Sequence, residues 1–491
     1  MSQKKLFVER VPNYVGGQWK PSANPEYVAI TNPATGEPLG SVPMGAAKDV
    51  DDAVRAAKAA FPAWSQLPAQ TRARFLYAFR EKMETHFDEL LSICTQEHGK
   101  TLEESKGDVR RGIDNVEVAC GMPTLMLREG GALEQIASGI DSHSVRQPMG
   151  VFAIIAPYNF PSMVPFWFLP YAIASGNTVV VKPSEQVPFS QLRLFELLHE
   201  CGLPPGVVNM VNGARDVVNG IVEHKDIAGV SFVGSSPVAE HVYTRCGATG
   251  KRVQALGGAK NFGVVMDDCD WEKTVANVVD SSMGCAGQRC LALSVVIGVG
   301  KAYAELEKRL PEALAKVKVG NGMEPGVTMG PVISARHRER VLAYVDKGVR
   351  EGAKLVVDGR GLAVPGLAKG HWVGPTLFVD VKPEMTVARE EIFGPVLCLM
   401  HAKDVDEALR IVKAHPLANA SSIYTSSGGH ARRWCKDVDA SMVGVNIGVA
   451  APMAFFGFGG AKGSFYGDLK AHGREQVAFY TQNKTSIVRW W

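Results

Sequence analysis

The repeat of apolar and polar positions changes near residue 150. Segments 50–62, 69–94 and 102–120 place apolar side chains every three or four positions, the spacing of amphipathic helices. Beyond residue 150, the apolar positions gather in short runs at 151–156, 178–181, 207–211 and 228–233, each followed by a turn signal and a helical segment. This pattern predicts βαβ units, in which helices cover both faces of a parallel sheet.

A second α/β unit is predicted between residue 262 and about residue 446. It begins with the apolar run 262–266, continues through a helical segment at 271–284, and resumes with the run 293–299. Cys290 therefore falls in a loop between a helix and a strand. Segments 132–146 and 475–491 fit neither unit. Both alternate polar and apolar residues as strands do, and we expect them to pair with another subunit.

Composition narrows the class of protein. With 491 residues, 46% of them hydrophobic, the chain is long enough for two or three packed units. Its 53 basic and 50 acidic residues form no run of like charge suited to nucleic acid. Nine cysteines without paired CxxC elements favour free thiols in a reducing compartment over disulfides or a metal site. No secretion signal or spanning segment is evident, so we expect a cytoplasmic protein without membrane attachment.

Cys290 is the first candidate for chemistry. It ends the stretch Gly-Cys-Ala-Gly-Gln-Arg-Cys at 284–290, whose small residues allow a ligand to approach the backbone. A thiolate attacks carbonyl carbons, and Arg289 beside it can lower the pKa of the thiol. A buried structural thiol is the usual alternative for a single cysteine. Cys285 also competes with Cys290 on spacing alone.

Thiol attack on an aldehyde creates an oxyanion, which requires hydrogen-bond donors. Asn159 follows a predicted strand within Ala-Pro-Tyr-Asn-Phe-Pro and is the best side-chain candidate, with an ordinary turn asparagine as the alternative. The resulting hemithioacetal must lose hydride, and a nicotinamide is the simplest acceptor.

Three further segments could hold such a cofactor. Lys182 and Glu185 leave one strand with charges suited to ribose hydroxyls, and Gly234-Ser235 opens a helix whose N-terminus could hold a pyrophosphate. Glu391 and Phe393 add a carboxylate and an aromatic ring. No GxGxxG is present, so ordinary strand-to-helix turns remain the alternative for these segments.

Together, these motifs resemble the aldehyde dehydrogenase superfamily over essentially the whole chain and in the family's order. The motifs are Pro-Tyr-Asn-Phe-Pro at 157–161, Lys-Pro-Ser-Glu at 182–185, Phe-Val-Gly-Ser-Ser at 232–236, Gly-Gln-Arg-Cys at 287–290 and Glu-Ile-Phe-Gly-Pro at 391–395. The resemblance implies that Cys290 is the nucleophile and that Asn159 and the Cys290 amide form the oxyanion hole. It also implies a set of NAD-binding residues: Ala156, Phe160, Lys182, Glu185, Gly234, Ser235, Glu391 and Phe393.

The resemblance also implies an α/β fold with a Rossmann-type cofactor domain, an α/β catalytic domain and a β oligomerisation arm. We expect the NAD-binding domain at 1–124 and 147–253, the catalytic domain at 254–446, and the arm with the C-terminal segment at 125–146 and 447–491. A homotetramer or homodimer is expected. NAD is preferred over NADP because Glu185 would repel a 2′-phosphate, although Lys182 could attract one.

Ala255 stands where hydrolytic members of the superfamily carry a water-activating glutamate before Leu-Gly-Gly. Water has a pKa of ~15.7 and a thiol ~8.5, so attack by water needs a base far more than attack by coenzyme A. We therefore expect no general base beside Cys290. Segments 258–261, 446–456 and 479–481 likewise resemble the CoA-acylating branch typified by methylmalonate-semialdehyde dehydrogenase.

In that branch, one arginine on an early helix and one before the nucleophile hold the substrate carboxylate. The matching residues here are Arg111 and Arg289, whose guanidinium groups suit a carboxylate. An ion pair with Asp108 or Asp114 is the alternative for Arg111. Two residues depart from the branch: Phe262 replaces a usual histidine, and Gln288 stands where glutamate is common.

The expected reaction is oxidation of methylmalonate or malonate semialdehyde to propionyl-CoA or acetyl-CoA, with NADH and carbon dioxide as further products. Coenzyme A is the co-substrate, no metal is needed, and valine breakdown is one source of such a semialdehyde. A hydrolytic NAD(P)-dependent aldehyde dehydrogenase that releases a free acid is the first alternative. A non-catalytic binding or scaffold protein of the same fold is the second.

Overall fold

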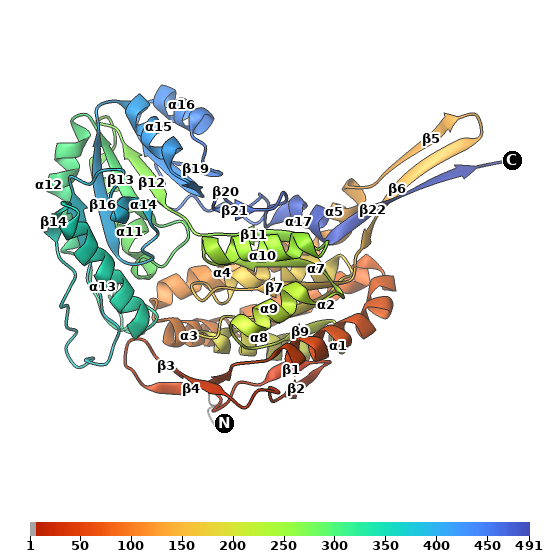
Figure 1. Cartoon of the computed structure of the whole chain (residues 1–491). Helices are drawn as coiled ribbons and strands as arrows, with labels where there is room; N and C mark the ends of the chain where they lie inside the picture. The colour runs from red at the N-terminus through yellow and green to blue at the C-terminus, as the bar shows by residue number, and fades with distance from the viewer. Residues whose placement is uncertain (1–5) are drawn as a thin grey trace.

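Two large twisted sheets and a projecting arm make up the computed structural model, which describes residues 6–491 (Figure 1). The first sheet has the strand order β2-β1-β9-β8-β7-β10-β11-β21. Its strands are β1 (Asn13–Val15), β2 (Gln18–Lys20), β7 (Val151–Ile155), β8 (Thr178–Lys182), β9 (Val208–Met210), β10 (Ile227–Val233), β11 (Arg252–Leu256) and β21 (Phe465–Tyr466). The five central strands, β7 to β11, are parallel, as predicted, and antiparallel strands close both edges.

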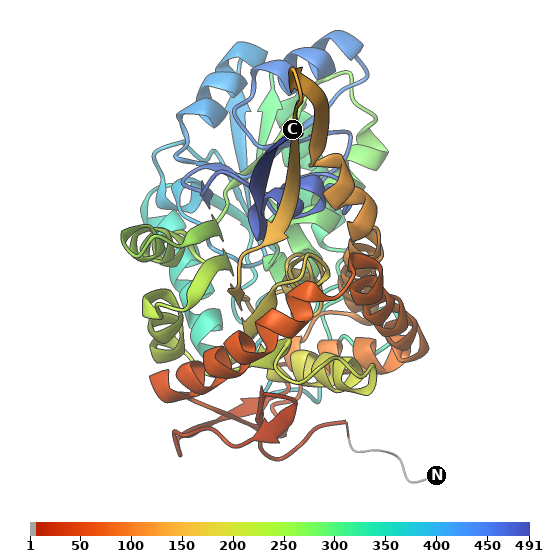
Figure 2. The ribbon, with the colours of Figure 1, turned by 90° about the vertical axis from the view of Figure 1, so that its right-hand side faces the viewer.

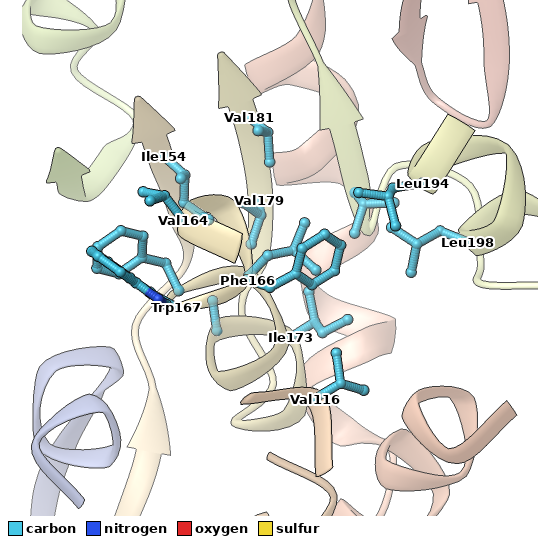
Figure 3. Packing of buried hydrophobic residues seen from close by; sticks show 14 of the residues in the cluster. Val116, Ile154, Val164, Phe166, Trp167, Ile173, Val179, Val181, Leu194 and Leu198 are labelled. Carbon is cyan, nitrogen blue, oxygen red and sulfur yellow. The ribbon is translucent and has the colours of Figure 1, made fainter. Parts of the chain in front are cut away.

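Helices cover both faces of this sheet because its strands are apolar on both sides. Val179 and Val181 of β8 belong to one buried cluster, whereas Val180 between them belongs to another on the opposite face. Figure 3 shows Val179, Val181 and neighbouring Ile154 beside Phe166 and other large side chains of the first cluster. The surrounding helices are α1 (Ala47–Gln66), α2 (Ala69–Thr85), α3 (Phe87–His98), α4 (Leu102–Cys120), α5 (Met122–Arg128), α6 (Met163–Phe166), α7 (Leu169–Ala174), α8 (Pro188–Glu200), α9 (Arg215–Glu223) and α10 (Ser236–Ala248).

One helical prediction needs correction. The segment 69–94 is not one continuous helix, because the chain turns at His86 between α2 and α3. The His86 backbone adopts φ −103° and ψ 20°, outside the helical range. The apolar repeat continues on both sides of this residue, so the pattern alone does not reveal the break.

The second sheet carries the predicted second α/β unit, in the order β14-β15-β16-β13-β12-β18-β19. Its strands are β12 (Asn261–Val265), β13 (Leu293–Val299), β14 (Lys354–Val357), β15 (Thr376–Val379), β16 (Val396–Ala402), β18 (Ala420–Tyr424) and β19 (Met442–Val445). Its helical segments are α11 (Trp271–Met283), the 3-10 turn η1 (Gly284–Gly287), α12 (Ala302–Leu314), α13 (Ala335–Arg350), α14 (Thr386–Arg389), α15 (Val405–Ala414) and α16 (Gly428–Asp437). All strand pairs except β14 with β15 are parallel.

The arm is a three-stranded antiparallel sheet that extends away from both units (Figures 1 and 2). It consists of β5 (Gly131–Ala137), β6 (Ile140–Pro148) and the C-terminal β22 (Thr481–Arg489). Residues 475–480, predicted as part of a strand, instead lie in α17 (Gly473–Tyr480), whose Val477, Phe479 and Tyr480 are buried. Six residues with alternating polarity fit a short helix as well as a strand.

Four short strands form two small antiparallel pairs: the hairpin of β3 (Tyr27–Thr31) with β4 (Pro38–Pro43), and β17 (Leu417–Ala418) with β20 (Ala461–Lys462), which are distant in sequence. The C-terminal segment also returns to the first sheet through β21. The expected domain boundaries stay a prediction. Among residues 6–491, no helix is both long and apolar enough to cross a membrane.

Candidate active site

A cavity of about 1020 Å³ lies at the carboxyl ends of β7, β8 and β10 and extends to the second unit. Strand order reverses between β7 and β10, the point where open α/β sheets bind ligands. Eight residues singled out from the sequence line this cavity: Ala156, Asn159, Lys182, Glu185, Gly234, Ser235, Glu391 and Phe393. Cys290 lines it as well. Phe160 does not, and its ring lies 4.0 Å from the Lys100 ammonium instead.

Cys290 lies in the loop between η1 and β13, as predicted. Its carbonyl oxygen accepts hydrogen bonds of 2.9 Å from the side-chain amides of both Asn261 and Asn419, which fix the backbone beside the thiol. Before it, the chain turns sharply through left-handed φ angles, and at Gly287 a Cβ would come within 2.1 Å of the Gly394 carbonyl oxygen. The fold therefore requires glycine three residues before Cys290.

The two cysteine candidates differ in their surroundings. Cys285 is only 1% exposed and is absent from the lining of the large cavity, whereas Cys290 lines it. The pKa of the Cys290 thiol is raised to about 12. Burial is the largest cause, the Glu391 charge acts in the same direction, and Arg289 opposes both. The geometry favours Cys290 as the nucleophile, in a pocket that holds its thiol protonated.

Glu391 bears on the expectation that no general base lies beside Cys290, because its carboxylate shares the cavity with this thiol. Its Oε1 accepts a hydrogen bond of 2.9 Å from the Ala259 amide, and its charge acts on the Cys290 thiol. Burial raises the pKa of Glu391, while the Ala259 amide and the charge of Lys260 oppose this increase. Residues 259 and 391 are far apart in sequence, so only the folded chain shows that this carboxylate shares a cavity with the thiol.

Asn159 and Gln288 join the two halves of the site. The Asn159 side-chain amide donates to the Gln288 carbonyl oxygen at 3.1 Å, which leaves its second N–H available to a ligand. Gln288 is fully buried; its side chain donates to the Cys285 carbonyl oxygen at 3.0 Å and accepts from the Ile333 amide at 3.0 Å. The neutral amide at 288 can satisfy both partners at once, which an ionised glutamate could not.

The opposite part of the cavity suits a dinucleotide. Lys182 Nζ lies 3.0 Å from Glu185 Oε2, and this ammonium lowers the pKa of Glu185 although burial acts in the other direction. Ser235 directly precedes α10, so the helix N-terminus can receive a phosphate. Gly234 lines the cavity, and a Cβ there would come within 2.5 Å of the Phe232 ring, so the packing of this ring requires glycine at 234.

The two arginines expected to bind a substrate carboxylate do not line the large cavity. Arg289 donates to Glu104 Oε1 at 3.3 Å and to the sulfur of Cys285 at 3.4 Å. Arg111 is half-buried and donates to the Pro452 carbonyl oxygen at 3.4 Å. Within residues 6–491 it forms no ion pair, so the expected alternative of an ion pair with Asp108 or Asp114 is wrong. The substrate role of both arginines stays a prediction.

Phe262, the other departure from the resembled branch, lies outside the large cavity. It lines a separate cavity of about 330 Å³, where its ring centroid is 5.5 Å from that of His415. The replacement of histidine by phenylalanine at 262 therefore does not alter the described lining of the Cys290 cavity.

Several cavity residues were not singled out from the sequence. Tyr158 contacts Gln288, while His337 and Arg340 reach the cavity from α13. His337 Nε2 lies 2.7 Å from the Phe393 carbonyl oxygen and thereby supports the segment with Glu391. Tyr158 stands inside a predicted motif and could have been chosen from it, whereas nothing in the local sequence of α13 pointed to this site.

Comparisons with known proteins agree with this geometry. The family model described as "Aldehyde dehydrogenase family" matches residues 19–486. A malonate-semialdehyde dehydrogenase of Geobacillus thermodenitrificans is 50% identical over 97% of this chain and 98% of its own. A solved methylmalonate-semialdehyde dehydrogenase of Oceanimonas doudoroffii is 42% identical, with a TM-score of 0.96 over 98% of this chain and 99% of its own.

A candidate methylmalonate-semialdehyde dehydrogenase of Sinorhizobium meliloti, solved in complex with NAD, is 39% identical with a TM-score of 0.96 over 100% of this chain and 99% of its own. The agreement of these structures along the whole chain confirms the predicted α/β fold class.

Proposed function

The chain belongs to the aldehyde dehydrogenase family, and from that premise we propose that it catalyses the NAD-dependent, CoA-acylating oxidation of malonate or methylmalonate semialdehyde. The observation that carries the proposal is the placement of Cys290 and Asn159 in one cavity, with apolar Ala255 at the position of the hydrolytic glutamate. The named activities of the similar proteins support the substrate class.

In the proposed reaction, the Cys290 thiol first releases its proton to solvent, and the thiolate then attacks the aldehyde carbon and forms a hemithioacetal. The free N–H of Asn159 and the Cys290 amide stabilise the oxyanion. A nicotinamide held beside Glu391 and Phe393 would accept the hydride that the hemithioacetal loses, and the Cys290 sulfur would then carry an acyl thioester. The thiolate of coenzyme A then attacks the acyl carbon, the bond to Cys290 breaks, and its sulfur regains a proton. Loss of carbon dioxide from the β-carboxylate, before or after this transfer, with uptake of a proton at the α-carbon, yields acetyl- or propionyl-CoA.

The proposed cofactor contacts follow the shape of the cavity. Lys182 and Glu185 face the adenosine ribose, Ser235 the pyrophosphate, and Glu391 with Phe393 the nicotinamide end. Ala156 and Gly234, which have small or no side chains, line the rest of this part of the cavity. Phe160 is removed from direct contact with the cofactor in this proposal, because it does not line the cavity.

The arm supports the further proposal of a homodimer or homotetramer. Every residue of β5 is exposed, and Leu133 and Ile487 are 66% and 70% exposed on the arm. Exposed apolar strands of this kind are suited to burial by another copy of the chain. All nine cysteines are free, which supports a cytoplasmic, reducing location.

Product analysis tests the proposal. Malonate semialdehyde, methylmalonate semialdehyde and propanal are each incubated with NAD, with and without coenzyme A, while NADH and acyl products are measured. We expect acyl-CoA as the product and a strong dependence of turnover on coenzyme A. Cys290→Ala should abolish turnover. Equal turnover without coenzyme A, with free acid as product, would refute the acylating reaction.

Glu391 supports a second candidate, hydrolysis of the thioester. A carboxylate with a raised pKa in the same cavity as Cys290 could accept a proton from water. Glu391→Gln keeps the hydrogen bond from Ala259 and removes the base. If this substitution abolishes free-acid formation and leaves acyl transfer to coenzyme A intact, Glu391 acts as that base. An unchanged ratio of free acid to acyl-CoA excludes this role.

A further inference from the structure

A fully buried cation lies directly behind the Asn159 turn. Lys100 is 0% exposed, and its ammonium donates to the Asn159 carbonyl oxygen at 2.7 Å. The same ammonium lies 4.0 Å from the centroid of the Phe160 ring. The Lys100 side chain thus contacts two successive residues of the turn, Asn159 and Phe160. Asn159 is the residue whose side chain is the proposed oxyanion donor.

Asp108, the counterion of Lys100, contacts the same turn at a second point. Asp108 is also 0% exposed; its Oδ2 lies 3.0 Å from Lys100 Nζ, and its Oδ1 accepts the Met163 amide at 2.6 Å. A buried carboxylate and ammonium are each costly to desolvate alone, so each depends on the other. This pair holds the turn at both ends, through Asn159 and Met163.

The first turn of α4 also holds the nucleophile loop. Glu104 in this turn and Asp108 are four residues apart and therefore lie on one face of α4, whereas Lys100 precedes the helix and its N-cap Thr101. Its Oε1 accepts from the Cys285 amide and from Arg289, while Oε2 accepts from the Thr101 amide at 2.8 Å. The start of α4 therefore contacts both segments that must meet for catalysis.

We propose that Lys100 is a positioning residue of the active site, which holds the Asn159 carbonyl so that the side-chain amide of Asn159 faces the oxyanion formed at Cys290. This inference rests on the proposed oxidation. Lys100 does not touch substrate or cofactor; it acts through Asn159. Removal of the ammonium leaves the Asn159 carbonyl buried without this donor, and the turn can relax by the fraction of an ångström that weakens an oxyanion contact.

The principal test replaces both members of the pair, because Lys100→Met alone would leave Asp108 charged and buried. Single-turnover NADH formation is measured with saturating NAD and propanal, an aldehyde without a carboxylate. Lys100→Met with Asp108→Leu should slow this step by about tenfold or more and leave NAD affinity close to wild type. Because the Asn159 carbonyl and the Met163 amide lose their partners, the melting temperature should fall, and rates are compared at a temperature at which both proteins are folded. Iodoacetamide modification of Cys290 should also be unchanged, since alkylation forms no oxyanion.

A double-mutant cycle assigns the effect to Asn159. In the Asn159→Ala background, the Lys100 and Asp108 replacements should cause no further loss. Lys100→Gln with Asp108→Asn restores an uncharged donor to the Asn159 carbonyl and should recover most of the rate. Arg110→Met is the matched control, because Arg110 on α4, the helix of Asp108, also pairs with a carboxylate, Glu84 at 3.0 Å, and lies 4.7 Å from the Phe87 ring.

Three results would overturn the proposal: equal losses in the wild-type and Asn159→Ala backgrounds, a parallel loss of Cys290 alkylation, or wild-type rates in the doubly apolar variant. If the apolar pair does not fold, the amide pair decides, since it must then fold and retain activity. A normal single-turnover rate in Asn159→Ala would also overturn the proposal. Failure of the proposed oxidation itself is distinguishable, because the wild-type protein would then form no NADH from propanal.

Discussion

Replacement of Glu391 by glutamine should make Cys290 more reactive in the free enzyme. The Glu391 charge is the largest influence after burial that raises the pKa of this thiol, which reaches about 12. At pH 8, a pKa of about 12 corresponds to a thiolate fraction of roughly 10⁻⁴. Removal of one nearby like charge shifts a pKa by on the order of one unit, or about 1.4 kcal/mol. The thiolate fraction should therefore rise about tenfold.

The assay is the second-order rate of Cys290 alkylation by iodoacetamide, followed by peptide mass spectrometry between pH 6 and 9. Because the thiolate forms as pH rises, the rate should increase with pH in both proteins, and the Glu391→Gln curve should lie at lower pH. Glu185→Gln is the control, since Glu185 lines the same cavity but is paired with Lys182 at 3.0 Å. An unchanged or slower rate in Glu391→Gln would refute the electrostatic reasoning.

Three further changes test other parts of the site. Arg111→Leu should lower kcat/KM for malonate semialdehyde roughly 30-fold relative to propanal, which corresponds to about 2 kcal/mol of lost transition-state binding. Equal losses with both aldehydes would show that Arg111 does not recognise the carboxylate. Glu185→Gln should raise the kcat/KM ratio of NADP to NAD by about tenfold, because a 2′-phosphate no longer meets a carboxylate; steady-state kinetics with an unchanged ratio would contradict this. Gln288→Leu leaves the Cys285 carbonyl and the Ile333 amide unpaired. The free energy of unfolding, measured by urea titration at fixed protein concentration, should therefore fall by about 2–5 kcal/mol. A change below about 0.5 kcal/mol would show that other groups replace these hydrogen bonds.

Motifs that lie at the ends of strands were predictable because the interactions that form them are local. The apolar run 151–156 predicted a strand, and the structure has β7 at Val151–Ile155 with Ala156 at the cavity. The run 293–299 matches β13 in full, so the loop position of Cys290 followed directly. The sequence did not determine whether segment 475–480 forms a helix or a strand. Its few apolar positions can face the interior in either structure, and the protein has helix α17 there.

The sequence by itself determined the α/β class, the βαβ order and the loop position of Cys290, the candidate nucleophile, because strand periodicity and strand-to-helix turns act over a few neighbouring residues. Only the tertiary structure decided which charges meet. It brought Glu391 to the Cys290 thiol, paired Arg289 with Glu104, and set Lys100 behind Asn159. These contacts join residues tens to hundreds of positions apart, and their strength depends on burial, which is a property of the packed molecule and not of any local stretch of chain.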